Sequence, residues 1–91
     1  MLISYDPEKN NQNILARNLS FDLVEEVEWS TAFILEDLRR DYGERRYTAQ
    51  GLIYGRLHTI VFTPRDDVMH VISLRKANLR EIRKYEQATI N

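Results

Sequence analysis

The sequence has 91 residues and a mass of 10.8 kDa, which supply one hydrophobic core, so we expect a single domain over residues 1–91 and not a two-domain enzyme. It contains no cysteine and two histidines, which excludes a disulfide framework, a thiolate zinc site and a cysteine nucleophile, and we expect neither a metal ion nor a cofactor. Residues 1–44 carry four basic and ten acidic side chains, a net −6, whereas residues 45–91 carry nine basic and four acidic ones, a net +5.

The N-terminal part of the chain predicts a strand followed by two helices. Residues 2–5 lack the features of a signal peptide and predict a short strand, so we expect a cytoplasmic protein. Asp6 and Pro7 supply an N-cap and a proline for the first turn, and a helix is predicted from there to Asn18. A second helix, short and acidic, is predicted to begin after Ser20, which can serve as its N-cap. Its apolar stripe consists of Leu23, Val24 and Val27.

The rest of the chain predicts an antiparallel sheet and a last helix. Residues 32–35 form a strand and residues 36–43 a loop. The segments 46–53, 56–63 and 68–74 alternate with period two and are joined by short turns, which is typical of antiparallel hairpins. Residues 76–88 have helical periodicity. We therefore expect an α+β fold in the order β-α-α-β-β-β-β-α, with helices packed mainly on one face of an antiparallel sheet.

The candidate functional residues are arginines and a tyrosine, since the sequence has no Gly-rich phosphate loop, paired-histidine metal motif or nucleophile elbow. Arg56, Arg65 and Arg75 lie at or beside predicted strand ends, where they are expected to converge on one rim with Tyr47. Arginine binds phosphate bidentately and an aromatic ring stacks on an unpaired base, so such a rim suits RNA. The alternative is that the arginines only solvate a sheet edge and that Tyr47 packs into the core or its rim.

Cleavage of RNA without a metal needs a base for the 2′-hydroxyl, cations that stabilise the phosphorane and an acid for the leaving oxygen. The side chains able to transfer a proton are Glu44, Tyr47, His58 and His70. A histidine on a strand is also commonly a hydrogen-bonded residue of the sheet. Lys76 and Arg80 lie on the polar side of the predicted last helix and suit either phosphate contact or a solvated helix face.

Arg75 has two interpretations, because it follows a predicted strand and precedes the last helix. In the functional one its guanidinium contacts the scissile phosphate, and its loss impairs cleavage without affecting stability. In the structural one it braces the start of the helix through an ion pair with an acidic side chain, and its loss lowers stability instead.

Short motifs along the whole chain share their order and spacing with a known family. They are YDPEKN at residues 5–10 with Asn13 and Phe21, ERRY at residues 44–47 with Gly51, GR at residues 55–56, IVFT at residues 60–63 with Arg65, and ISLRKA at residues 72–77 with Glu81 and Tyr85. In this arrangement the chain resembles the BrnT family of bacterial toxins. Where the family usually has Lys-His-Gly after the first helix this chain has residues 16–18, Ala-Arg-Asn, and Tyr47 stands in place of a usual tryptophan.

The resemblance implies a RelE-like α+β endoribonuclease that cleaves RNA and arrests growth until an antitoxin neutralises it. It implies a ribbon-helix-helix antitoxin of the BrnA type, a heterotetrameric complex, and promoter DNA bound through the antitoxin. The catalytic residues that it implies are Arg45, Tyr47, Arg65 and Arg75. The basic residues expected to bind RNA beside them are Arg56, Lys76 and Arg80. The alternative function is a non-catalytic partner-binding subunit of a transcriptional repressor complex.

Overall fold

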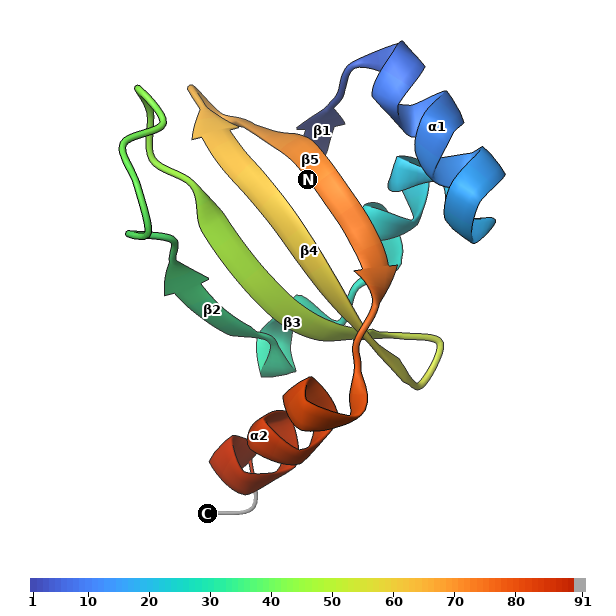
Figure 1. The fold of residues 1–91 in the computed structure, drawn as a ribbon, viewed down its shortest axis with the longest axis vertical. Helices are drawn as coiled ribbons and strands as arrows, with labels where there is room; N and C mark the ends of the chain where they lie inside the picture. Colours follow the sequence, from blue (N-terminus) through green and yellow to red (C-terminus); the bar gives the residue numbers. More distant parts are fainter. Residues whose placement is uncertain (90–91) are drawn as a thin grey trace.

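A five-stranded sheet forms the centre of the protein, whose computed structural model describes residues 1–89 (Figure 1). The elements are β1 (Leu2–Ser4), α1 (Pro7–Arg17), the 3-10 helices η1 (Phe21–Glu26) and η2 (Trp29–Thr31), β2 (Phe33–Glu36), β3 (Tyr47–Ile53), β4 (Arg56–Arg65), β5 (Val68–Lys76) and α2 (Leu79–Thr89). The predicted α+β class is confirmed. Within the described residues, no helix is long and apolar enough to cross a membrane.

The strands lie in the order β1-β5-β4-β3-β2, and the pairs from β2 to β5 are antiparallel as predicted. The prediction of a wholly antiparallel sheet is wrong at one edge, where β1 runs parallel to β5. These two strands are separated by most of the chain, so no tight hairpin dictates their relative direction. The short parallel strand closes the edge of β5 and gives a mixed sheet.

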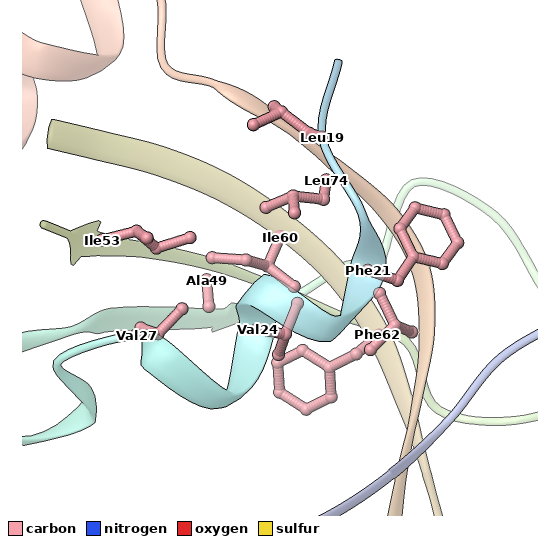
Figure 2. Packing of buried hydrophobic residues seen from close by; sticks show 10 residues of the cluster. Leu19, Phe21, Val24, Val27, Ala49, Ile53, Ile60, Phe62 and Leu74 are labelled. Atoms are coloured by element: carbon pink, nitrogen blue, oxygen red, sulfur yellow. The ribbon is translucent and has the colours of Figure 1, made fainter. Parts of the chain in front are cut away.

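Register sorts the side chains of the sheet into two faces, since residues opposite one another share a face and successive residues alternate. One row across the sheet is Ala49, Ile60 and Leu74, all fully buried. We call this the covered face, because η1 packs against it with Val24 among these side chains (Figure 2).

The next row, Gln50, Thr59 and Arg75, belongs to the opposite side, which we call the open face. Among residues 1–89 no helix crosses its middle, although α2 covers the end near the β3–β4 turn (Figure 1). At that end Leu57 and Ala77 pack beneath Tyr85, whose hydroxyl donates to Thr31 O at 2.9 Å. From the middle of β3 to the β4–β5 turn, the open face is partly accessible at Thr48, Val61 and His70, whereas Thr59 and Thr63 are buried.

The segment after α1 is 3-10 helical, whereas the sequence predicts an α-helical pattern for it. Ser20 is the N-cap as predicted, accepting from Asp22 N at 3.2 Å, but the segment forms the two 3-10 helices. A 3-10 helix has three residues per turn, so Phe21, Val24 and Val27 align on one side, and all three are buried. This spacing of three, and not the stripe that begins at Leu23, is what the segment presents to the core.

The helix α1 is attached by hydrogen bonds, because its buried side chains are two asparagines. Asn10 Oδ1 accepts from Phe21 N at 2.8 Å, and Asn13 Nδ2 donates to Leu19 O at 2.9 Å and to Leu74 O at 3.0 Å. Leu15, by contrast, is 87% exposed. Asn13 thus ties α1 to both the loop that follows it and the middle of β5.

The last helix begins later than predicted, and β5 is correspondingly longer. Lys76 ends β5, and α2 runs from Leu79 instead of from residue 76. Asn78 and Glu81 form a capping box, in which Asn78 N donates to Glu81 Oε1 and Glu81 N donates to Asn78 Oδ1, both at 2.9 Å. This box fixes the first turn of α2.

Gly51 of β3 lies against the residues that end η1 and η2, Val27 and Ala32. A Cβ at this position would be 2.6 Å from Val27 Cγ1 and 3.4 Å from Ala32 Cβ. We expect Gly51→Ala to lower the free energy of unfolding by about 1–3 kcal/mol in urea titration, because the extra methyl group overpacks this contact. Adding Val27→Ala removes the clashing methyl group, so the double variant should be more stable than the sum of the single effects predicts. Strict additivity would contradict this packing.

Candidate functional site

Cationic side chains lie at both ends of the open face. Its middle carries small polar and aliphatic side chains, namely Thr48, Gln50, Val61 and Ser73. Arg65 lies towards the β4–β5 turn, and Arg75 lies beside α2. Positive charge therefore flanks a polar surface that no helix of residues 1–89 crosses.

We call Glu44, Arg65 and His70 the Arg65 cluster. Arg65 donates through Nη2 to Glu44 Oε1 at 2.9 Å and through Nε to Glu44 Oε2 at 3.3 Å. His70 is opposite Thr63 and Arg65 is opposite Val68, so Arg65 and His70 are diagonal neighbours on the open face. The two side chains of the ion pair are 51% and 42% exposed, and hydrogen bonding from Arg65 lowers the pKa of the Glu44 carboxyl.

His70 is the proton-transfer candidate of this cluster. Its Nδ1 lies 2.9 Å from Ser4 Oγ, across the parallel β1–β5 pairing. Burial lowers the pKa of His70, and the nearby Arg65 guanidinium lowers it further. The imidazole is therefore neutral at pH 7, and in the tautomer with the proton on Nδ1 its Nε2 carries a lone pair.

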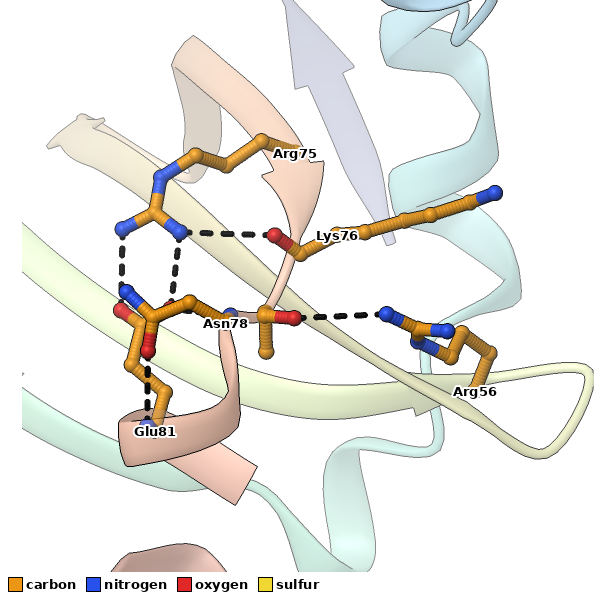
Figure 3. Close-up of polar contacts among 6 residues, drawn as sticks. Arg56, Arg75, Lys76, Asn78 and Glu81 are labelled. Carbon is orange, nitrogen blue, oxygen red and sulfur yellow. Dashed lines mark hydrogen bonds and ion pairs between the residues drawn. The ribbon is translucent and has the colours of Figure 1, made fainter. Parts of the chain in front are cut away.

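Arg75 forms the other ion pair of the open face. Its Nη1 and Nη2 donate to the two carboxylate oxygens of Glu81 at 2.7 and 2.9 Å, and Glu81 also belongs to the capping box with Asn78 (Figure 3). Hydrogen bonding from Arg75 lowers the pKa of Glu81 to about 2. This arrangement agrees with the structural interpretation of Arg75, in which it braces the start of α2.

The expectation that the predicted site residues converge on one rim is wrong. Arg75 is opposite Thr59 of β4. Thr59 and Arg65 are six residues apart along β4, which separates them by about 20 Å. Successive antiparallel strands end at opposite ends of a sheet, so arginines at successive strand ends cannot all meet. Tyr47 lies on the covered face, stacked on Phe62 with ring centroids 5.6 Å apart.

Arg45 lies close to Tyr47, whose hydroxyl raises the pKa of the Arg45 guanidinium. The structure thus groups Arg45 with Tyr47, and Arg65 with Glu44 and His70, whereas Arg75 stands apart. The catalytic roles inferred for these four residues from the family resemblance stay predictions.

The basic residues expected to bind RNA lie mostly away from the open face. Lys76 is opposite His58 on the covered face, and Arg56 Nη2 donates to Ala77 O at 3.3 Å (Figure 3). Arg80 is exposed on α2. These three side chains surround the end of the sheet near the β3–β4 turn, remote from the Arg65 cluster.

His58 is a hydrogen-bonded residue of the sheet. It is 4% exposed on the covered face, and its Nδ1 lies 2.8 Å from Arg56 O. Burial lowers its pKa, which keeps the ring neutral inside the protein. No cluster of three or more His, Cys, Asp or Glu side chains suited to a metal ion occurs within residues 1–89.

Sequence reasoning gave no role to Ser4 and did not identify Glu81 as the partner of Arg75. Glu81 follows Asn78 by three residues, and this spacing is the signature of a capping box, so a local signal for it exists. Ser4 has no local signal, because its contact with His70 depends on the pairing of two strands at opposite ends of the chain.

Comparison with known proteins assigns the chain to a family. A family model described as ribonuclease toxin, BrnT, of type II toxin-antitoxin system matches residues 5–81. The match includes the Arg65 cluster, Arg75 and Glu81, and it confirms the resemblance found in the sequence. No curated protein matches the chain significantly.

The Arg75–Glu81 pair predicts a pH-dependent stability. The pKa of Glu81 is lower in the folded protein than its ordinary value of 4.5, so the pair stabilises above that value and its contribution disappears as the pH falls through about 2. Because the pair is partly solvated, Glu81→Gln should reduce the free energy of unfolding by on the order of 1 kcal/mol at pH 7 and hardly at all at pH 2. Denaturant titration over this range measures the difference.

Glu86→Gln is the matched control, since Glu86 is an exposed carboxylate on the same helix without an ion pair among residues 1–89. A loss for Glu81→Gln that stays constant with pH would show that the amide disturbs the capping box and that the charge of Glu81 is immaterial.

Proposed function

This chain belongs to the BrnT family of ribonuclease toxins of type II toxin–antitoxin systems, and from that premise we propose that it cleaves RNA without a metal ion at the Arg65 cluster. Such cleavage arrests growth until an antitoxin neutralises the toxin. The observation that carries the proposal is the meeting of a guanidinium, a carboxylate and a neutral imidazole on an accessible sheet face.

In this proposal Arg65 holds the scissile phosphate. Its ion pair with Glu44 is about half exposed, so exchanging the carboxylate for a phosphate costs little. The planar guanidinium donates two parallel hydrogen bonds to phosphate oxygens. Its charge then stabilises the dianionic phosphorane more strongly than the ground state, and that difference lowers the barrier.

His70 acts as the general base. Nδ1–H donates to Ser4 Oγ, and Nε2 takes the proton of the 2′-hydroxyl. The 2′-oxygen forms a bond to phosphorus, the bond from phosphorus to the 5′-oxygen breaks, and that oxygen leaves with a proton from water. The products are a 2′,3′-cyclic phosphate and a 5′-hydroxyl, and no oxidant or metal enters the balance.

For Arg75 we propose a bracing role at α2 in place of a direct phosphate contact. Its carboxylate partner Glu81 is only 17% exposed and also caps the helix. A phosphate that displaced Glu81 would therefore have to break both the ion pair and the capping box. Arg45 and Tyr47, on the covered side, are proposed to support the packing against Phe62.

The antitoxin is proposed to be a ribbon-helix-helix protein of the BrnA type. A segment of it outside the ribbon-helix-helix domain is proposed to cover the open face. A segment that is disordered when free and ordered when bound suits an elongated sheet surface of this kind. The complex then binds promoter DNA through the antitoxin.

The test of the proposed activity is cleavage of RNA by purified protein in EDTA. Arg65→Ala should reduce the rate by about 10²-fold or more, because the phosphorane loses its cation. The melting temperature should hardly change, since exposed ion pairs contribute about 0–1 kcal/mol. Arg65→Lys should recover little of the rate, because an ammonium lacks the bidentate fork.

Arg83→Ala, which removes an exposed arginine from α2, is the matched control and should cleave at the wild-type rate. The wild-type rate should also rise with pH with a midpoint below 6.5, as His70 loses its proton. Full activity of Arg65→Ala would remove the Arg65 cluster from catalysis. Intact RNA after long incubation with wild-type protein would instead favour the non-catalytic, partner-binding function.

The stoichiometry of the complex can be predicted from the antitoxin type. Ribbon-helix-helix proteins dimerise through their DNA-binding domain, so two toxins and two antitoxins should form a heterotetramer. Light scattering of the co-purified complex measures its mass. A mass equal to one toxin bound to an antitoxin dimer would refute the doubled arrangement.

A further inference from the structure

We propose that the loop between β2 and β3 carries a binding site for single-stranded RNA, at a surface hollow of about 280 Å³ lined by Arg39, Arg40, Tyr42 and Arg46. The site would hold a phosphate and its neighbouring base. This inference rests on the proposed function, since it names a part of the substrate path outside the Arg65 cluster.

Asp37 gives the loop a fixed shape. Its carboxylate, in a side chain only 3% exposed, accepts from the backbone N, Nε and Nη2 of Arg39 and from the hydroxyl of Tyr42 at 2.8 to 3.1 Å. Asp37 N also donates to Arg46 O at 2.7 Å, which extends the β2–β3 ladder into the loop. The Tyr42 ring is therefore held in place before any ligand arrives.

Two guanidiniums lie over this ring without a carboxylate partner. The Arg46 guanidinium carbon is 3.8 Å and that of Arg40 5.0 Å from the ring centroid of Tyr42. Neither arginine forms an ion pair with any residue from 1 to 89, and the buried Arg46 Nε has no hydrogen-bond partner there. Two guanidiniums beside an aromatic ring, one of them with an N–H group left unpaired within residues 1–89, suit a ligand that joins a phosphate to a planar base.

The position of the loop favours RNA as that ligand. Arg46 precedes Tyr47, which lies on the covered face, so by strand alternation Arg46 lies on the side of the open face. Arg65 belongs to the strand next to β3, and adjacent strands are about 5 Å apart. One RNA strand held at the Arg65 cluster can thus reach the Tyr42 ring, where a base stacks and Arg40 and Arg46 hold a phosphate.

The site can be tested by binding without cleavage. A short fluorescein-labelled 2′-O-methyl oligoribonucleotide lacks the attacking hydroxyl, and anisotropy gives its Kd over a range of salt concentrations. Tyr42→Ala should raise Kd about tenfold because stacking is lost, whereas Tyr42→Phe, which keeps the ring but loses the hydroxyl contact with Asp37, should raise Kd by a smaller factor. Arg40→Gln should reduce the salt slope by about 0.7, while Tyr42→Ala leaves the slope unchanged.

Two controls match these variants. Tyr54→Asn removes an exposed tyrosine from the β3–β4 turn, where asparagine tolerates the positive φ of 48°, and Arg83→Gln removes an exposed arginine from α2. Both should keep the wild-type Kd and salt slope. Melting temperatures establish that all variants are folded, and the Arg40→Gln slope remains informative should Tyr42→Ala unfold.

The outcomes separate this inference from the proposed function. The RNA site would be overturned, and the proposed catalysis kept, by three results together. Tyr42→Ala would bind RNA with wild-type affinity, Arg40→Gln would leave the salt slope unchanged, and cleavage would be normal. Tyr42-dependent binding in a protein that cleaves no RNA would support the site and refute the proposed catalysis. Variants that bind RNA normally but lose the antitoxin would assign the loop to the protein partner and overturn the inference.

Discussion

Every side chain of β4 belongs to one of two faces, and this alternation determines which groups of the protein can meet. Ile60 enters the core under η1, while Thr59 and Val61 on either side of it belong to the open face. A shift of one residue in the register would exchange the two sets, bury the arginines and expose the core. The accessible chemistry of the protein is therefore a consequence of how its core is packed.

Local patterns are sufficient for the strands and caps of this chain. Period-two alternation predicts β3, β4 and β5, and Asp6 caps α1 by accepting from Glu8 N, as its position before Pro7 indicates. The attachment of α1 could not be predicted, because buried Asn10 and Asn13 look like surface residues in an amphipathic analysis. Their partners are backbone atoms of η1, the preceding loop and β5, which only the folded chain brings together.

The location of the candidate site could not be predicted from local patterns either. Residue type nominates the arginines and His70 as candidates, but their grouping depends on strand direction and on the length of β4, which continues through Pro64 to Arg65. Arg65 and Arg75 are each held by a carboxylate, and exposure distinguishes the two pairs. Arg65 and Glu44 are half in water, whereas Glu81 is largely enclosed, so a phosphate competes far more easily for Arg65 than for Arg75.

Part of the charge asymmetry of the sequence becomes a separation between the two sides of the sheet, although Lys76 is on the covered face and Glu44 belongs to the Arg65 cluster. The acidic side chains of residues 22–28 are exposed on the segment that packs on the covered face, whereas Arg46 and Arg65 belong to the open face. Layers packed face to face lie about 10 Å apart, and screening at physiological salt acts over about 8 Å. RNA at the open face thus experiences the local field of its arginines, and the net charge of −1 does not oppose its binding.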